Sequence, residues 1–440
     1  MSDSQILQSA QHTINKLSIV SKIVDIDITG MFEELNIFDS IFNPCMTGNI
    51  LINDSIGLSS KLSFDGSEIL IVDIGKTADQ AVIKKTFRIY KQGSRKSLNL
   101  SSEAYILYFV SDEFILSQQM KISQSFKTTY SDIAYKILNN YLGVENANIS
   151  LFENSFGVRN IIIPNKSPFE AIDFCAKRAV NSTISPTFLF FENKLGYNFV
   201  TTSTLISRPA VHNINFQPKN ITQNTRELMG AMHYEIISQY DLNKNIRSGM
   251  YAGTFIGFDI NSRGVATKIV DHDSLYKKSN HANKTANIGS IENKQGLKNT
   301  EMFNSRRVLY PTTVFAASSD YVKQNEPSSL NVDDDTYNYV LQREASLQTL
   351  MNLRLKLVMP GNFDLTSGLT ANLTIPTRGE KARGVDETDH SLSGKYLITA
   401  TRHIISYLKH ETIIEVSTDS TNRNQIFTST REQNDAAELY

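Results

Sequence analysis

The sequence predicts a mainly β protein of the α+β class, and three observations lead to this prediction. Short segments in which apolar and polar residues alternate fill residues 20–115, and a period of two is typical of half-buried strands. The same alternation returns after Tyr240 and continues towards the C-terminus. Between these regions, residues 119–222 contain helical patterns. Five or six strands within about 100 residues, without a clear helix, indicate an antiparallel barrel or sandwich.

Composition narrows the class of protein further. The chain has 440 residues, 40% of them hydrophobic, with 44 basic and 45 acidic residues and a net charge of -1. At roughly 100–200 residues per domain, this length predicts about two to four domains. The balanced charge argues against an open nucleic-acid-binding surface. Two cysteines, Cys45 and Cys175, exclude a disulfide framework and a four-cysteine zinc site, and predict free thiols.

The N-terminal segment has helical spacing. In residues 4–17, Leu7, Ala10, Ile14 and Leu17 recur on one helical face, which predicts a short amphipathic helix. A helix of this length needs a docking surface, either on its own chain or on a neighbouring subunit. The segment lacks the basic and apolar regions of a secretory signal, and nowhere do about 18 apolar residues run together. We therefore expect a soluble protein made in a cytoplasm.

Period-two segments follow this arm. They are KIVDIDIT, NILINDS, EILIVDIG, KKTFRIYKQG and EAYILYFVS. Turn residues at Asn43-Pro44, Asp65-Gly66 and Gly93-Ser94 separate them, as expected for consecutive antiparallel strands.

The helical stretch contains the clearest local signal. Ser167, Pro168 and Glu170 occupy the N-cap, first and third helical positions of SPFEAIDFCAKRAVN, which predicts a capping box. Ser131 is a candidate cap for an earlier helix that Gly143 closes. TFLFFE and YNFVTT then predict a hairpin.

Strands resume in the last part of the chain. IRSGMYAGTFIGFDI and GVATKIVD precede a polar stretch, residues 276–305, and a helix that starts in the acidic run DDDTYNYVL. The closing strands are LRLKLVM, LTANLTIP, GKYLITATRHII and ETIIEVSTD. The residues after 420 are polar.

Candidate catalytic and metal-binding patterns are weak throughout. Gly75-Lys76-Thr77 lacks the earlier glycine of a phosphate-binding loop. His272 and His281 flank a polar loop, and His403 and His410 can face each other across a hairpin, but neither pair completes a zinc site. Adjacent acids such as Asp25 and Asp27 are typical of solvated positions. The sequence therefore predicts no catalytic residue, no cofactor and no metal.

Two longer segments carry a family resemblance. The first contains, in order, Glu34-Leu35-Asn36-Ile37, Phe42-Asn43-Pro44, Thr47-Gly48, Asp54 and Asp65-Gly66-Ser67-Glu68. The second contains Gly361, Ser367-Gly368, Ser393-Gly394 and His403. In this order the segments resemble the baseplate hub proteins of contractile-tailed bacteriophages and, more distantly, the hub part of type VI secretion spike proteins.

The resemblance implies a structural protein, not an enzyme. It implies a homotrimer in which each subunit contributes two antiparallel β-barrel-like tube domains, so that six domains form a hollow ring. The ring would join the tail tube to the central spike in the virion baseplate, after assembly in the host cytoplasm. DNA would pass through without specific binding. Baseplate wedge proteins and the tape measure protein are further expected partners, and no membrane is involved.

The resulting division of the chain has six parts. They are an N-terminal amphipathic arm (1–18), a first tube domain (19–118), an α+β insert (119–222), a second tube domain (223–275 with 346–420), a polar insert and helix (276–345) and a polar tail (421–440). Gly48, Gly368 and Gly394 are expected to allow turns or close backbone approach.

Two rival functions remain at this stage. One is a tail-associated cell-wall hydrolase that uses scattered carboxylates, and the other is an adhesin that binds host cells. The cluster of Lys84, Lys85, Arg88 and Lys91 around one strand bears on the hub interpretation. In a hub these residues should face outward or meet acidic partner surfaces, because an unpaired basic lumen would retain DNA.

Overall fold

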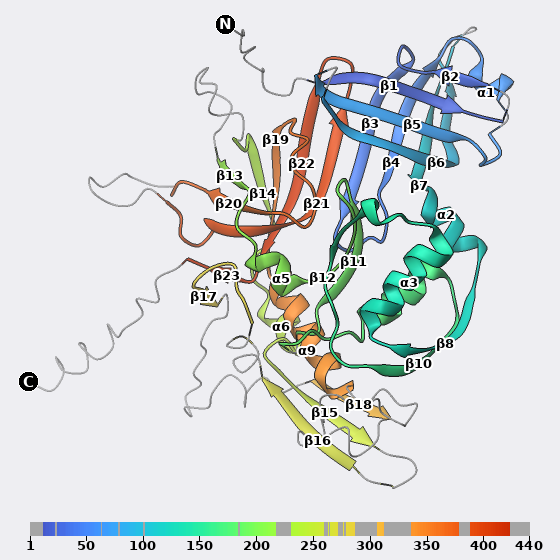
Figure 1. Cartoon of the computed structure of the whole chain (residues 1–440). Helices are drawn as coiled ribbons and strands as arrows, with labels where there is room; N and C mark the ends of the chain where they lie inside the picture. Colours follow the sequence, from blue (N-terminus) through green and yellow to red (C-terminus); the bar gives the residue numbers. More distant parts are fainter. Residues whose placement is uncertain are drawn as a thin grey trace, which may run out of the picture.

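The computed structural model describes residues 12–216, 230–286, 306–311, 336–377 and 388–422, except positions 23, 63, 78–79, 100–101, 184, 259–262, 264, 272–275 and 277–278. Over these residues the chain is mainly β with a helical insert, so the predicted α+β, mainly β class is confirmed (Figure 1). None of the helices described is long and apolar enough to cross a membrane.

One large sheet organises the molecule. Thirteen of the described strands belong to it, and its main path runs β14-β19-β22-β21-β3-β4-β7-β6-β5-β1-β2. Its first part consists of β1 (Thr13–Val20), β2 (Asp25–Asp27), β3 (Phe32–Ser40), β4 (Thr47–Asp54), β5 (Ile69–Thr77), β6 (Gln80–Ser97) and β7 (Glu103–Ser111). Its second part consists of β13 (His212–Asn215), β14 (His233–Ser238), β19 (Leu353–Pro360), β20 (Thr370–Thr374), β21 (Gly394–Ile405) and β22 (His410–Thr418). Over the described strands the path has two ends, β14 and β2, and does not close into separate barrels.

Each part of the sheet covers its own hydrophobic core. The first core includes Leu35, Ile50 and Phe109, and the second includes Leu355, Ile398 and Ile414. In β4 the burial alternates strictly, with Ile50 and Ile52 inside and Asn49 and Leu51 partly exposed, as the sequence pattern predicts. A short helix, α1 (Leu58–Lys61), follows β4.

The predicted N-terminal helix is wrong over the part that the structure describes. Residues 13–20 form β1, which pairs antiparallel with β5 and β2. Leu17 and Ile19 are both buried, and their spacing of two residues is typical of a strand. The spacing of three between Ile14 and Leu17 fits a helix equally well, so the sequence pattern does not separate the two structures. An isolated short helix is marginal, so the hydrogen bonds offered by the edge of β5 decide the outcome. Residues 1–11 lie outside the described residues.

The α+β insert packs below the first part of the sheet. Its elements are α2 (Asp112–Gln119), β8 (Ile122–Thr128), α3 (Tyr130–Leu142), the 3₁₀ turn η1 (Asn146–Asn148), β9 (Ile149–Phe152), β10 (Arg159–Lys166), α4 (Pro168–Ala176), β11 (Phe188–Asn193), β12 (Gly196–Thr201) and α5 (Thr202–Ser207). A separate core holds it together, built from residues such as Ile133, Ile172 and Phe188. Strands β11 and β12 form the hairpin that the sequence predicts.

Both predicted helices of the insert are present. Helix α4 starts with the capping box: the Ser167 side chain accepts from the Glu170 backbone N–H, the Glu170 carboxylate accepts from the Ser167 N–H at 2.8 Å, and Pro168 is the first helical residue. The cap of α3 is Thr129 and not Ser131, because Ser131 already lies within the helix and exchanges hydrogen bonds with Ser155.

The remaining elements lie at the end of the sheet that also holds the insert. They are α6 (Leu242–Ser248), β15 (Ala252–Phe258), β16 (Val265–Asp271), β17 (Thr285–Ala286), β18 (Arg306–Pro311), α9 (Thr336–Leu350) and β23 (Ser420–Thr421). Strands β16, β15 and β18 form a small sheet that packs on α9. Arg343 of α9 donates to the carbonyl oxygens of Pro186 and Phe188, which fixes this unit to the insert.

The three glycines singled out from the sequence sit in crowded places. A Cβ atom on Gly48 would lie 2.2 Å from the ring of Phe109 and 2.4 Å from the Asn36 carbonyl oxygen. Gly368 has a φ of 85°, which other residues adopt only with strain. A Cβ on Gly394 would meet the Asn283 side chain at 2.5 Å. The two cysteines are buried free thiols, as predicted.

Candidate functional site

The strongest functional feature is the seam at which the two parts of the main sheet join. We use "the seam" for the antiparallel pairing of β3 with β21, which runs from Leu35 opposite Ile405 to Ser40 opposite Ala400. In Figure 1 the red strands near the C-terminus therefore lie beside the blue strands near the N-terminus. One continuous sheet thus spans the two cores.

A polar network crosses the seam on the face of the sheet opposite the cores, which we call the open face. Arg402 Nε donates to Asn36 Oδ1 at 2.9 Å, and Asn36 Nδ2 donates to Glu34 Oε1 at 2.7 Å and to Asn49 Oδ1 at 3.0 Å. The Arg402 guanidinium also lies over the Phe38 ring, 5.4 Å from its centre. The network joins β21, β3 and β4 and neutralises the arginine charge.

Two further basic residues on the open face are paired within the chain. Arg354 Nη2 lies 2.8 Å from Glu415, and Lys356 Nζ lies 3.3 Å from Glu235. Arg354 and Lys356 alternate along β19 with Leu353, Leu355 and Leu357, which are buried in the core. The side chains of the two cations therefore lie on the open face. The basic residues of β19 therefore add little net positive charge to the open face.

The core side of the seam contains a buried carboxyl group. Asp39 accepts hydrogen bonds from the Thr366 hydroxyl and, at 3.4 Å, from the Ser367 N–H. Burial raises the pKa of Asp39 to about 6, although the hydrogen bonds from Thr366 and Thr401 oppose this rise. The tip of the β11–β12 hairpin touches the same region, because Asn193 Nδ2 donates to the Ser367 carbonyl at 2.7 Å.

A largely buried ion pair ties the insert to the sheet. Lys85 of β6 pairs with Glu192 of β11, and Glu192 also accepts from the Ser111 hydroxyl at 2.5 Å and the Met46 N–H at 2.9 Å. Burial lowers the pKa of Lys85 to about 8. Arg88 similarly pairs with Asp112 at 2.7 Å.

The expectation for the basic cluster on β6 is therefore wrong for two of its members. Lys85 and Arg88 neither face outward nor await a partner surface, because Glu192 of the α+β insert and Asp112 at the start of α2 are their acidic partners. Lys84 and Lys91 are exposed, and Lys91 Nζ lies 5.2 Å from the centre of the Tyr108 ring.

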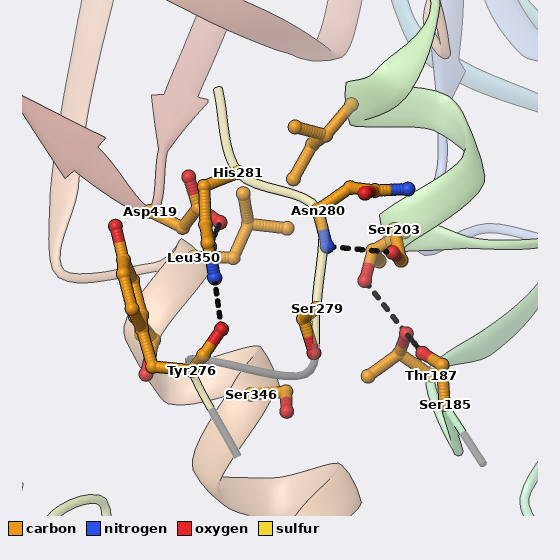
Figure 2. A pocket seen from close by; sticks show the side chains of 13 residues that line it. Ser185, Thr187, Ser203, Tyr276, Ser279, Asn280, His281, Ser346, Leu350 and Asp419 are labelled. Atoms are coloured by element: carbon orange, nitrogen blue, oxygen red, sulfur yellow. Dashed lines mark hydrogen bonds and ion pairs between the residues drawn. The ribbon is translucent and has the colours of Figure 1, made fainter. Parts of the chain in front are cut away.

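A small polar pocket offers the best place to look for catalysis (Figure 2). Hydroxyl groups from Ser185, Thr187, Ser203, Ser279 and Ser346 line it, beside His281 and Asp419. Its volume of about 40 Å³ has room for a few water molecules.

The serine, histidine and aspartate in this pocket do not form a catalytic triad. His281 Nδ1 lies 2.7 Å from Asp419 Oδ2, and His281 Nε2 lies 2.5 Å from the Tyr276 carbonyl oxygen. Burial would lower the pKa of His281, but the hydrogen bond and charge of Asp419 outweigh it and raise the pKa. Ser203 is directed at the Asn280 N–H instead (Figure 2). Neither ring nitrogen of His281 is therefore placed to take a proton from Ser203.

The paired histidines of the closing hairpin meet as the sequence suggests. His403 Nδ1 lies 3.3 Å from His410 Nε2, and His410 stacks on Phe363 with ring centres 4.0 Å apart. Burial lowers the pKa of His403 to about 4 and that of His410 to about 2. Within the described part of the chain, no three metal-ligating side chains come together. His272 lies outside the described residues.

Sequence reasoning missed the seam, the Asp39 site and the Lys85–Glu192 pair. The alternation around Asn36 was visible, but its partner Arg402 is 366 positions away, and no local pattern connects the two. The signal for Lys85 and Glu192 in the sequence was a charged residue directly after the apolar run FLFF of β11.

Two solved structures share this fold over nearly the whole chain. A tail protein from Neisseria meningitidis matches with a TM-score of 0.53 and 13% identity, covering 93% of this chain and 97% of that one. The 43 kDa tail protein of prophage MuSo2 from Shewanella oneidensis matches with a TM-score of 0.52 and 10% identity, covering 92% and 99%. A type VI secretion component from E. coli matches with a TM-score of 0.43 and 10% identity, covering 90% and 76%.

These comparisons concern the fold. No family model and no curated protein matches the sequence. The chain has the fold of phage tail proteins. The resemblance noted in the sequence is thus confirmed at the level of the fold.

Proposed function

We propose that this protein is the hub of a phage baseplate, a homotrimeric ring that joins the tail tube to the central spike. The observation that carries the proposal is the seam. A ring that continues a tube needs a wall without gaps, and here β3 and β21 make one sheet from two parts with separate cores. The two ends of this sheet, β14 and β2, are where neighbouring copies would continue the wall.

The open face supplies the second support. In the proposed ring this face lines the channel. DNA carries one negative charge per about 1.7 Å of duplex, so unpaired cations on the wall would hold it by counterion release. Arg354, Lys356 and Arg402 are paired with acids of the same chain, which suits passage without retention. Lys91, on the same face, lies over the Tyr108 ring and is the exception among these cations.

The polar pocket favours a structural role over hydrolysis. His281 is engaged at both ring nitrogens, and Ser203 is bonded elsewhere. We therefore propose that the protein is not an enzyme, and that the spike, tube and wedge proteins are its partners in the virion baseplate. The tape measure protein is a further proposed partner.

The test is the mass and shape of the purified protein. Sedimentation with and without the spike protein should give three copies of this chain, and particle images should show a threefold ring with a central hole. A chain that remains a monomer in the presence of the spike would contradict the proposal. Turnover of cell-wall polymer would support the hydrolase instead, and binding to whole host cells would support the adhesin.

A further inference from the structure

The turn between β21 and β22 carries two exposed apolar side chains, Tyr407 and Leu408, which we call the tip pair. They are 75% and 90% exposed, the highest values among the large hydrophobic residues in the described part of the chain. Neither residue has a positive φ, so no special turn conformation selects them. Two adjacent large apolar side chains in water indicate a contact that the described residues do not supply.

The tip pair is held in place from below. The Ser406 N–H donates to the Lys409 carbonyl oxygen at 2.8 Å, and Ile405 pairs with His410 across the hairpin. His410 in turn stacks on Phe363, with ring centres 4.0 Å apart. A surface fixed in this way loses little conformational entropy when another segment covers it.

The start of β1 lies beside this tip, although β3, β4, β7, β6 and β5 separate β1 from β21 along the sheet. His12 Nε2 lies 2.8 Å from the Ser406 carbonyl oxygen, and the His12 and His410 ring centres are 5.9 Å apart. Strand β5 also contacts the second part of the sheet, because Lys76 pairs with Asp364 at 2.5 Å. The first part of the sheet therefore curls back towards the second and brings the chain before His12 to the tip (Figure 1).

The segment before His12 has the composition to cover the tip pair. Residues 1–11, MSDSQILQSAQ, contain the adjacent apolar residues Ile6 and Leu7. The five positions from Leu7 to His12 span about 8 Å in a helix and at most about 18 Å in an extended chain. Either span brings Leu7 within reach of the tip pair, which directly follows the Ser406 that His12 contacts.

Charge does not oppose such a contact. Lys409 in the turn is already paired with Glu411 at 2.6 Å, so the tip is nearly neutral. Asp3 carries the only charged side chain in residues 1–11. The attraction between the segment and the tip is therefore apolar.

We propose that residues 1–11 of this chain fold over the tip and bury Tyr407 and Leu408 beneath Ile6 and Leu7. The covered tip would fasten the start of β1 to the β21–β22 hairpin, and so hold the curl of the first part of the sheet against the second. The inference concerns contacts within one chain and does not depend on the hub function. The same segment of a neighbouring copy is the competing occupant, and the experiments separate the two.

The first experiment measures how well the tip is covered, through a single reporter thiol. Cys45 and Cys175 are both buried, so an introduced surface cysteine is the thiol that reacts with Ellman's reagent in the folded, full-length chain. The thiol of Leu408→Cys should react about tenfold more slowly than that of Ile162→Cys, because a segment docked for about nine-tenths of the time blocks it for that fraction. Ile162 is the matched reference, since it is 61% exposed on β10 in the insert.

A further substitution tests whether the segment provides this protection. Adding Leu7→Asp to the Leu408→Cys chain should raise the labelling rate to that of the reference, because a buried carboxylate without a partner is costly. Ser2→Asp adds the same charge at a polar position and should leave the protection unchanged. Cys45 and Cys175 stay unreactive in a folded variant, so the same assay shows that each variant is folded.

The second experiment identifies the chain that supplies the segment. Mild oxidation of the double variant Leu7→Cys with Leu408→Cys should form a disulfide within one chain, which keeps the mass of a monomer on a non-reducing denaturing gel. The control pair, Ser2→Cys with Leu408→Cys, should cross-link less.

Three results would overturn the inference. They are equal labelling rates of Leu408→Cys and Ile162→Cys, protection that Leu7→Asp leaves intact, and a cross-link that joins two chains. The last result would assign the cover to a neighbouring copy. Neither experiment requires a trimer, so a failure of the hub function would leave both readouts valid.

Discussion

Arg402 and Asn36, 366 positions apart in the sequence, are joined by a hydrogen bond of 2.9 Å across the seam. The first prediction concerns this contact. Arg402→Leu should lower the free energy of unfolding by about 1 kcal/mol. This is less than a fully buried hydrogen bond to a charged group contributes, because Arg402 is partly exposed to solvent. Urea denaturation measures this, with Lys356→Leu on the same face as a control of smaller effect. A loss no larger than that of the control would mean that the network does not hold the seam.

Gly48 leads to a second prediction. A methyl group there overlaps the Phe109 ring and the Asn36 carbonyl, so Gly48→Ala should cost about 1–3 kcal/mol through overpacking. Gly30→Ala is the matched control, because nothing lies within 4 Å of its added Cβ. Thermal unfolding of the two variants should differ by several degrees. If both unfold with the wild type, β3, β4 and β7 are packed more loosely than the structure shows.

The buried Asp39 predicts a dependence of stability on pH. Its pKa is raised from 3.8 to about 6 in the folded chain, so its neutral form is preferred there. The corresponding stability is present below pH about 4 and is lost as pH rises through 6. Asp39→Asn should therefore stabilise the protein at pH 8 by about 1–3 kcal/mol and have little effect at pH 4. Denaturation at the two pH values checks this, and destabilisation at pH 8 would show that the charge is needed.

The capping box gives a local prediction. Ser167→Ala should lower stability by about 1 kcal/mol and leave assembly intact, because the hydroxyl serves only the start of α4. The control is Ser207→Ala near the end of α5, which removes a serine hydroxyl that caps no helix start. It should lower stability less than Ser167→Ala does. Full stability combined with lost partners would make Ser167 a binding residue.

Passage of DNA gives the last prediction. Titration of the trimer with duplex DNA at low and moderate salt should show an affinity no better than the ~10⁻⁴–10⁻⁶ M of generic contact. Because Arg402, Arg354 and Lys356 are paired, replacing their partners Glu34, Glu415 and Glu235 with Gln should free the cations and raise the affinity. Nanomolar binding by the wild type that collapses with salt would identify a DNA-binding protein.

Several features of the fold follow from local patterns in the sequence. The alternation in β4 fixed which of its residues face the core, and Ser167, Pro168 and Glu170 fixed the start of α4, because both depend on neighbours within a few positions. The fold class and the resemblance to phage tail proteins followed from the order of such segments.

Tertiary structure decided everything that depends on distant partners. Residues 13–17 fit a helix or a strand, and pairing with β5 selected the strand. Lys85 forms an ion pair within the chain only because the insert places Glu192 beside β6. Asn36 contacts Arg402 only because β21 pairs with β3. The free energy of such contacts depends on burial and on partners hundreds of positions away, and neither quantity is a property of a local sequence pattern.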